Sequence, residues 1–78
     1  MKQQRKTPHR RIACNELITL EGQCQTLCVV ELSEDGRVER HYPLQQELAY
    51  TEWMQGRLSL RKGADGVIRL YKDDNLIN

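Results

Sequence analysis

The sequence predicts a small, mainly β domain of the α+β class. We expect an antiparallel sheet, or a partly open barrel, of about five strands with one short helix between the third and fourth. Apolar and β-branched residues recur in stretches that alternate with period two. Two Asp-Gly dipeptides, Asp35-Gly36 and Asp65-Gly66, stand between such stretches. Because glycine adopts positive φ without steric cost, Asp-Gly in this position is a strong hairpin signal.

The first half of the chain reads as three strands. The first is predicted over residues 11–21 and the second over 24–32, with a short turn at Gly22 between them. In the second strand the more apolar face is expected to point to the core, and it contains Cys24, Thr26, Cys28, Val30 and Leu32. A third strand over 37–42 should end at Pro43, which has no N–H for a ladder hydrogen bond.

Residues 44–55 are predicted to form the short helix. The segment is rich in Gln, Glu, Leu, Ala and Met, which are good helix formers, and Leu44–Leu48 is one of its i,i+4 apolar pairs. The stretch from Tyr50 to Trp53 also contains strand formers, so a strand is the alternative for this part.

The last part of the chain reads as a second hairpin. Residues 57–61 alternate strictly, with Leu58 and Leu60 expected to face inward, and a final strand is predicted over 67–72. We expect residues 73–78 to fray, with docking of Leu76 and Ile77 as the alternative. The order of elements agrees with the five-stranded OB-type barrel, but other small antiparallel sheets with one helix share it, so it identifies no family.

The charge distribution divides the chain into two parts. Five of the 12 basic residues lie within the first 11 positions, where there is no acid: Lys2, Arg5, Lys6, Arg10 and Arg11. The remaining seven are outnumbered by 11 acidic residues. We therefore predict a flexible basic arm over 1–10 and a single, mildly acidic β-rich domain over 11–78.

The environment expected from the sequence is the reducing cytoplasm. Residues 1–11 lack the apolar stretch of a secretory signal, and no segment is long and apolar enough to span a membrane, so no membrane partner is expected. The three cysteines are an odd number, whereas small secreted scaffolds pair their cysteines evenly.

No constellation of residues indicates catalysis, a cofactor or a metal. Zinc ligands drawn from His9, Cys14, Cys24 and Cys28 are disfavoured, because a strand holds the last two about 13 Å apart. Glu39 and His41 share a strand face by period two, which is ordinary for a solvated surface, and no cysteine is placed to react with them. We therefore predict a protein that is not an enzyme.

The leading hypothesis is a binding or structural module that acts through protein–protein contact. The contact candidates are Tyr50, Trp53 and Met54, although Trp53 could instead anchor the core. Because so short a chain builds only a thin core, the partner could be a second copy in a homodimer. The alternative is an OB-like nucleic-acid binder in which the five basic residues of the arm hold phosphates.

Overall fold

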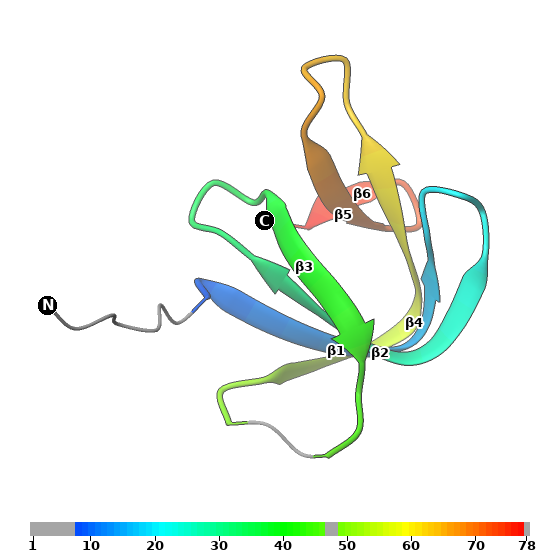
Figure 1. Cartoon of the computed structure of the whole chain (residues 1–78), viewed down its shortest axis with the longest axis vertical. Coiled ribbons are helices and arrows are strands. Elements are labelled where there is room, and N and C mark those ends of the chain that lie inside the picture. Colours follow the sequence, from blue (N-terminus) through cyan, green and yellow to red (C-terminus); the bar gives the residue numbers. More distant parts are fainter. Residues whose placement is uncertain (1–7, 47–48, 78) are drawn as a thin grey trace, which may run out of the picture.

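β-Strands arranged in a single mixed sheet make up the fold (Figure 1), seen in a computed structural model that describes residues 8–46 and 49–77. The strands are β1 (Arg10–Ile18), β2 (Cys24–Leu32), β3 (Val38–Pro43), β4 (Glu52–Lys62), β5 (Ile68–Lys72) and β6 (Asn75–Ile77). Their order across the sheet is β3-β2-β1-β4-β5-β6. Neighbouring strands pair antiparallel, except that β1 and β4 run parallel.

The helix predicted over 44–55 is wrong wherever the structure describes that segment. Glu52–Gln55 begins β4, and residues 44–46 and 49–51 are irregular; residues 47–48 lie outside the described part. The start of β4 pairs with β1 in the register Ile12↔Glu52, Ala13↔Trp53 and Cys14↔Met54. These tertiary hydrogen bonds outweigh the helix propensity of the segment, which is only a few tenths of a kcal/mol per residue. No helix capable of spanning a membrane is found in the described ranges.

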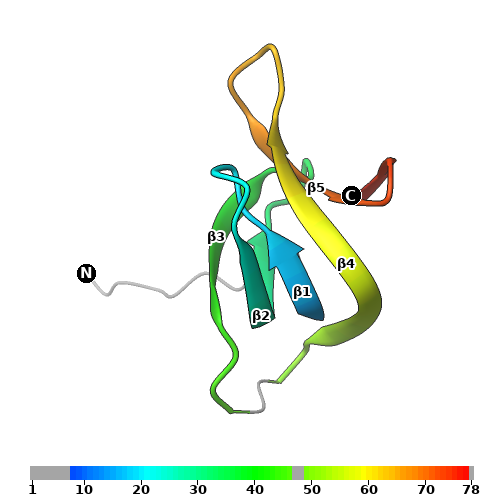
Figure 2. The same ribbon diagram turned by 90° about the vertical axis from the view of Figure 1, so that its right-hand side faces the viewer.

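The prediction of a fully antiparallel sheet is also wrong, because a crossover precedes β4. β3 ends beside β2, where Cys28 pairs with Pro43, whereas β4 begins beside β1. The described parts of the chain between them, residues 44–46 and 49–51, lie below β2 and β1 in Figures 1 and 2. Parallel neighbours require such a crossing connection, whereas antiparallel neighbours need only a tight turn. We call residues 44–46 and 49–51 the crossing segment.

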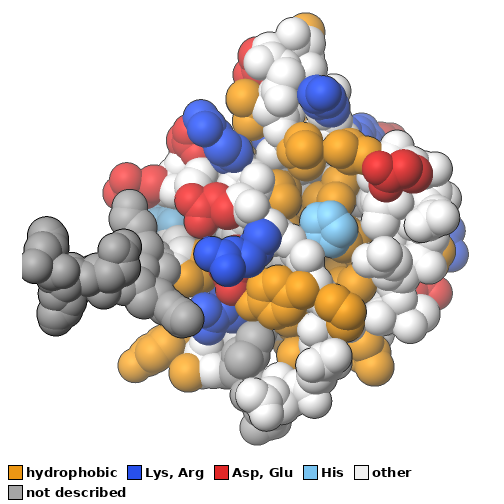
Figure 3. Space-filling model, in the orientation of Figure 1, with side chains coloured by type: hydrophobic (Ala, Val, Ile, Leu, Met, Phe, Trp, Pro, Cys, Tyr) orange, Lys and Arg blue, Asp and Glu red, His pale blue; other side chains and the backbone are white. Residues whose placement is uncertain are grey.

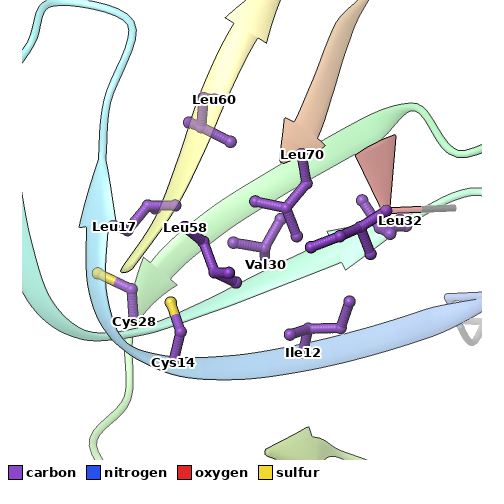
Figure 4. Close-up of a cluster of buried hydrophobic side chains, with 10 residues drawn as sticks. Ile12, Cys14, Leu17, Cys28, Val30, Leu32, Leu58, Leu60 and Leu70 are labelled. Atoms are coloured by element: carbon purple, nitrogen blue, oxygen red, sulfur yellow. The ribbon is translucent and has the colours of Figure 1, made fainter. Parts of the chain in front are cut away.

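The core lies on the inner face of the bent sheet and contains no aromatic side chain. Side chains from β1, β2, β4, β5 and β6 converge there (Figure 4). The buried cluster consists of Ile12, Cys14, Leu17, Cys28, Val30, Leu32, Leu58, Leu60, Leu70 and Ile77. The inward orientation predicted for Leu58 and Leu60 is confirmed. The chain end predicted to fray instead forms β6, and Ile77 docks in the core while Leu76 stays exposed.

The alternation predicted for the second strand holds for only part of β2. Cys28, Val30 and Leu32 are buried, but Cys24 and Thr26 are exposed. Leu27 has φ 52, a left-handed conformation that interrupts the strict two-residue alternation. The expectation that Cys24 and Thr26 belong to the core face is therefore wrong.

Both Asp-Gly hairpins are confirmed, and their turns share one design. Gly36 and Gly66 have φ of 86 and 81, which glycine adopts without strain. The Asp65 carboxylate accepts the Val67 N–H at 3.0 Å and pairs with Arg69 at 2.9 Å. The Arg69 guanidinium and this N–H lower the pKa of Asp65 to about 2. The first hairpin repeats the arrangement with Asp35 and the N–H and guanidinium of Arg37.

The strand boundaries near the hairpins shift slightly from those predicted. β1 ends at Ile18 rather than near residue 21, because Thr19 and Gln23 already form the turn through a 2.8 Å backbone hydrogen bond. β3 includes Pro43 as its last residue. This position is tolerated because β3 is an edge strand, so the missing N–H costs no ladder hydrogen bond.

The sheet curves back on itself without closing. An isolated bridge between Arg37 and Arg69 joins the start of β3 to the start of β5. Figure 2 shows the bend, with β4 and β5 swinging round toward the side on which β3 lies. In the part of the chain that the structure describes, β4 pairs with β5 only from Leu58 onward, so its first half has β1 as its strand partner on one side alone.

Candidate protein-contact site

The outer face of β1 and β2 is covered, although it points away from the core. Ala13 and Val29 pair with each other across these strands and are 1% and 0% exposed. Neither belongs to the inner core cluster. At the start of the crossing segment, the Leu44 N–H donates to the Leu27 carbonyl of β2 at 2.7 Å.

A buried carboxylate, Glu31, lies on the same outer face. Its side chain is 7% exposed and accepts from Arg11 Nε at 3.2 Å, while Arg40 Nε lies 3.1 Å from its other oxygen. The Tyr42 hydroxyl also donates to it. The carboxylate is thus fully satisfied by three donors, as a buried charge must be. Burial and the adjacent Glu31 raise the pKa of Tyr42, so the phenol stays protonated as the donor.

The Glu31 network extends to the crossing segment through Arg11. Arg11 Nη1 donates to the Ala49 carbonyl at 2.7 Å, and the Thr51 hydroxyl donates to the same oxygen at 3.2 Å. The Glu31 carboxylate therefore orients a guanidinium that holds Ala49. The residue after it, Tyr50, has φ 54, which L-residues with side chains adopt only at a cost of about 1–3 kcal/mol. The hydrogen bonds on Ala49 and the entry into β4 hold the backbone on either side of this strained position.

Two aromatic side chains project beside this anchored backbone. Tyr50 is 88% exposed and Trp53 is 51% exposed. Trp53 pairs with Ala13 and so lies on the outer face, which rules out a core role for it. Met54, the third residue predicted for protein contact, pairs with Cys14 and packs against the inner core. Trp53 and Met54 therefore lie at the start of β4 on opposite faces, and Tyr50 lies two residues before the strand.

The basic residues predicted for nucleic-acid binding are only partly within the described chain. Lys2, Arg5 and Lys6 lie outside it. Arg10 and Arg11 belong to β1, where Arg10 makes a two-pronged contact with Glu52 at 2.9 and 2.7 Å. This contact raises the pKa of Arg10 and lowers that of Glu52. Both guanidiniums are thus at least partly neutralised by carboxylates.

The face that carries β3 shows interspersed charges rather than a basic surface. In the space-filling view, Lys and Arg side chains alternate with Asp and Glu side chains, and hydrophobic side chains surround a histidine near the middle (Figure 3). Glu39, Arg40 and His41 are all exposed on β3. A uniform positive field of the kind that tracks a phosphate backbone is not formed on this face.

The three cysteines differ in burial, and they form no metal site in the described chain. Cys14 and Cys28 are buried opposite each other on β1 and β2, whereas Cys24 is exposed. Burial raises the pKa of Cys14 to about 11 and also raises that of Cys28, so both remain thiols at neutral pH. Across residues 8–46 and 49–77, no three His, Cys, Asp or Glu side chains are placed to hold a metal ion.

A hollow of about 540 Å³ lies apart from the aromatic pair. It lies between residues 8–9 and the first Asp-Gly hairpin and is lined by Pro8, His9, Ser33, Glu34, Asp35, Arg37 and Glu39. Its lining is polar, and its Asp35 and Arg37 already pair with each other at 3.3 Å.

One feature of the sequence indicates the Glu31 network, although it was not among the predictions above. Glu31 interrupts the apolar stretch Val29-Val30 and Leu32, and a charge in such a stretch needs partners when the strand is buried on both faces. The partners themselves, Arg11 and Arg40, become visible only from the strand register.

Comparisons of the chain with protein-family models, with curated proteins and with solved structures gave no significant match.

Proposed function

We propose that this chain is a non-enzymatic binding module that acts through protein–protein contact, with Tyr50 and Trp53 as its anchors. The observation that supports the proposal most is the exposure of Tyr50, 88%, on backbone that is fixed on both sides. Tyrosine and tryptophan are enriched among the residues that dominate binding free energy at interfaces.

The support beneath the two rings favours binding over an incidental surface position. Single exposed apolar residues are common and need no explanation. Here, however, a buried carboxylate and a guanidinium hold the carbonyl next to Tyr50, and the Tyr50 backbone is kept at a positive φ. A backbone held in this way loses less conformational entropy when the segment binds, which is the advantage of a preorganised contact.

The test compares retained proteins among three immobilised variants of the full chain. Proteins captured from cells that express the chain are quantified for the wild type, for the double variant Tyr50→Ala/Trp53→Ala, and for Leu76→Ala. Leu76 is a matched control because it is also an exposed large apolar residue, on β6. A partner retained by the wild type and the control but lost with the double variant is then purified and titrated against each. If no retained protein depends on the two aromatic residues, the proposal is wrong.

The nucleic-acid alternative is a separate proposal that rests on the basic arm. Because Arg10 and Arg11 are engaged by Glu52 and Glu31, it now depends mainly on Lys2, Arg5 and Lys6. The arm should therefore be removed only to residue 7, which leaves β1 intact. Gel-shift assays with single- and double-stranded DNA and RNA at about 50 mM salt provide the test. Binding that disappears with residues 1–7 supports this alternative, and absence of binding by the full chain refutes it.

A further inference from the structure

Two of the three cysteines face each other in the middle of the sheet. Cys14 on β1 and Cys28 on β2 are direct partners in the strand register, and they are 0% and 1% exposed. Both side chains belong to the inner core cluster, and Figure 4 shows their sulfur atoms on the same side of the two strands. The two thiols are therefore neighbours inside the core, although they are distant in the sequence.

The hydrogen-bond pattern of these strands makes Cys14 and Cys28 a non-hydrogen-bonded pair. The Thr19 N–H donates to the Gln23 carbonyl, and these two residues continue the register of β1 and β2 without a shift. Because hydrogen-bonded and non-hydrogen-bonded pairs alternate along antiparallel strands, the odd-numbered residues of β1 are hydrogen-bonded to β2 and Cys14 is not. The Cα atoms of such a pair lie about 4.5 Å apart, and a disulfide accepts a Cα separation of roughly 4.4–6.8 Å. The register therefore gives the two cysteines a spacing that a disulfide can bridge.

The sheet is irregular directly beside this pair. The register of β1 and β2 passes over Asn15 and Leu27, which are both exposed, and Leu27 has φ 52. On the other side of β1, the pairing with β4 shifts between Cys14 and Glu16. A local opening at an interrupted ladder breaks fewer hydrogen bonds than one inside a continuous ladder. The two thiols therefore lie at a place where small backbone adjustments and brief openings of the core cost little.

The Cys28 sulfur lies at the rim of the core. Its Sγ is 3.6 Å from the side-chain oxygen of Gln25 and 3.9 Å from the carbonyl oxygen of Thr26, and both of these residues are exposed. A small polar oxidant therefore reaches Cys28 before it reaches Cys14. Burial raises the pKa of both thiols, so the thiolate forms rarely and oxidation is slower than at an exposed cysteine.

From these observations we propose that Cys14 and Cys28 are a redox-active pair that hydrogen peroxide converts into a cross-strand disulfide. The Cys28 sulfur attacks one peroxide oxygen, the O–O bond breaks, and Cys28 becomes a sulfenic acid while the other oxygen leaves as water. The Cys14 sulfur then attacks the Cys28 sulfur, and the sulfenic hydroxyl leaves with the Cys14 proton as a second water. Two thiols and one peroxide thus give one disulfide and two waters. This inference is independent of the proposed function.

The disulfide ties the sheet together where the crossing segment leaves and returns. Cys28 pairs on its other side with Pro43, which directly precedes that segment, and Cys14 pairs on its other side with Met54, near the start of β4. The bond closes the chain between residues 14 and 28 into a loop, which restricts the unfolded state and so stabilises the fold. Disulfides in reducing compartments are usually transient and redox-sensing. The pair is therefore a reversible oxidation site that raises stability while peroxide is present.

Mass spectrometry of the folded full chain after treatment with hydrogen peroxide tests the pairing. The variant Cys24→Ser is used, because the exposed Cys24 could otherwise link two molecules. Its treated form should lose two hydrogens and have no thiol left to alkylate in urea, and dithiothreitol should restore both thiols. Cys14→Ala and Cys28→Ala, which each keep Cys24 and one other cysteine, are the controls and should form no disulfide within the chain. Two thiols or added oxygen in Cys24→Ser, or an equally fast disulfide in either control, overturns the pairing.

Thermal melting followed by circular dichroism tests the effect of the bond on the fold. Oxidised Cys24→Ser should melt at least about 5 °C above its reduced form, and dithiothreitol should reverse the shift. The double variant Cys14→Ala/Cys24→Ser is the control for other effects of peroxide, since it keeps only one cysteine, and its midpoint should not rise. An oxidised Cys24→Ser that melts no higher than its reduced form, or a control that gains as much, would overturn the stabilising role of the disulfide.

Discussion

Replacing Glu31 with glutamine should destabilise the fold by about 2 kcal/mol. Glu31 is buried, with 5% of the residue exposed. Its carboxylate accepts hydrogen bonds from Arg11 and Tyr42 and forms an ion pair with Arg40. A hydrogen bond to a charged group contributes about 1.5 kcal/mol or more, and a neutral-donor contact about 1 kcal/mol. The Arg40 pair adds only about 0.5 kcal/mol, because that side chain is 67% exposed and well screened by solvent.

The expected loss is smaller than the sum of these contributions. Glutamine keeps one carbonyl oxygen and so retains about 1 kcal/mol of the roughly 3 kcal/mol in the network. Arg11 and Arg40 are partly exposed and regain water when the carboxylate charge is removed, which avoids the larger penalty of an isolated buried charge. For a chain of this size, about 2 kcal/mol corresponds to a fall of about 10 °C in the melting midpoint.

Urea denaturation followed by circular dichroism measures the effect, with Glu39→Gln as the control. Glu39 is exposed on β3, so its substitution should change the free energy of unfolding by less than about 0.5 kcal/mol. Backbone amide relaxation of Tyr50 and Thr51 gives a second readout, because a misoriented Arg11 should release the Ala49 carbonyl and increase their motion. If Glu31→Gln is no more destabilising than Glu39→Gln, the network does not anchor the crossing segment and the reasoning is refuted.

Three further predictions concern the core, the second hairpin and the thiols. Leu58→Ala should cost about 3 kcal/mol in urea denaturation by removing fully buried apolar contacts, whereas the exposed Leu76→Ala should cost less than about 1 kcal/mol; similar losses would contradict the core assignment. Because Arg69 helps lower the pKa of Asp65 to about 2, this carboxylate contributes stability above its unfolded pKa near 4, and that contribution is lost as the pH falls toward 2. Unfolding measured from pH 5 to 2 should therefore depend less steeply on pH in D65N. A thiol reagent at pH 8 should label Cys24 rapidly in the folded protein and the other two cysteines only on unfolding; rapid labelling of all three would contradict their burial.

Local signals predicted the hairpins because their causes are local. At Asp35-Gly36 and Asp65-Gly66, the glycine conformation and the aspartate hydrogen bonds involve residues at most four positions apart. The alternation of Leu58 and Leu60 likewise reflects one strand and one core. These features follow from the steric freedom of glycine and from period-two geometry, so a single sequence is sufficient to predict them.

The features that escaped prediction depend on partners distant in the sequence. Residues 52–55 become a strand because β1, about forty positions earlier, pairs with them in parallel. Without that partner their composition favours a helix. The exposure of Cys24 depends on the positive φ of Leu27, which no residue type at that position signals. In the candidate site, Tyr50 and Trp53 were predicted by residue type, but their anchoring through Glu31 required the register of β1, β2 and β3.

The anchored position of Tyr50 and Trp53 follows from the parallel pairing of β1 and β4. A parallel neighbour obliges the chain to cross the sheet, and the crossing backbone must have its polar groups satisfied. Arg11 satisfies the Ala49 carbonyl, and Glu31 orients Arg11, so a buried charge on the outer face serves the crossover. The same crossover delivers the chain to β4 at Glu52, ahead of Leu58, where the pairing with β5 begins, and it places Tyr50 and Trp53 around this strand start. The anchoring of the aromatic pair is therefore a result of this topology, and a variant that loosens the crossing segment should weaken the proposed binding through Tyr50 and Trp53 together with stability.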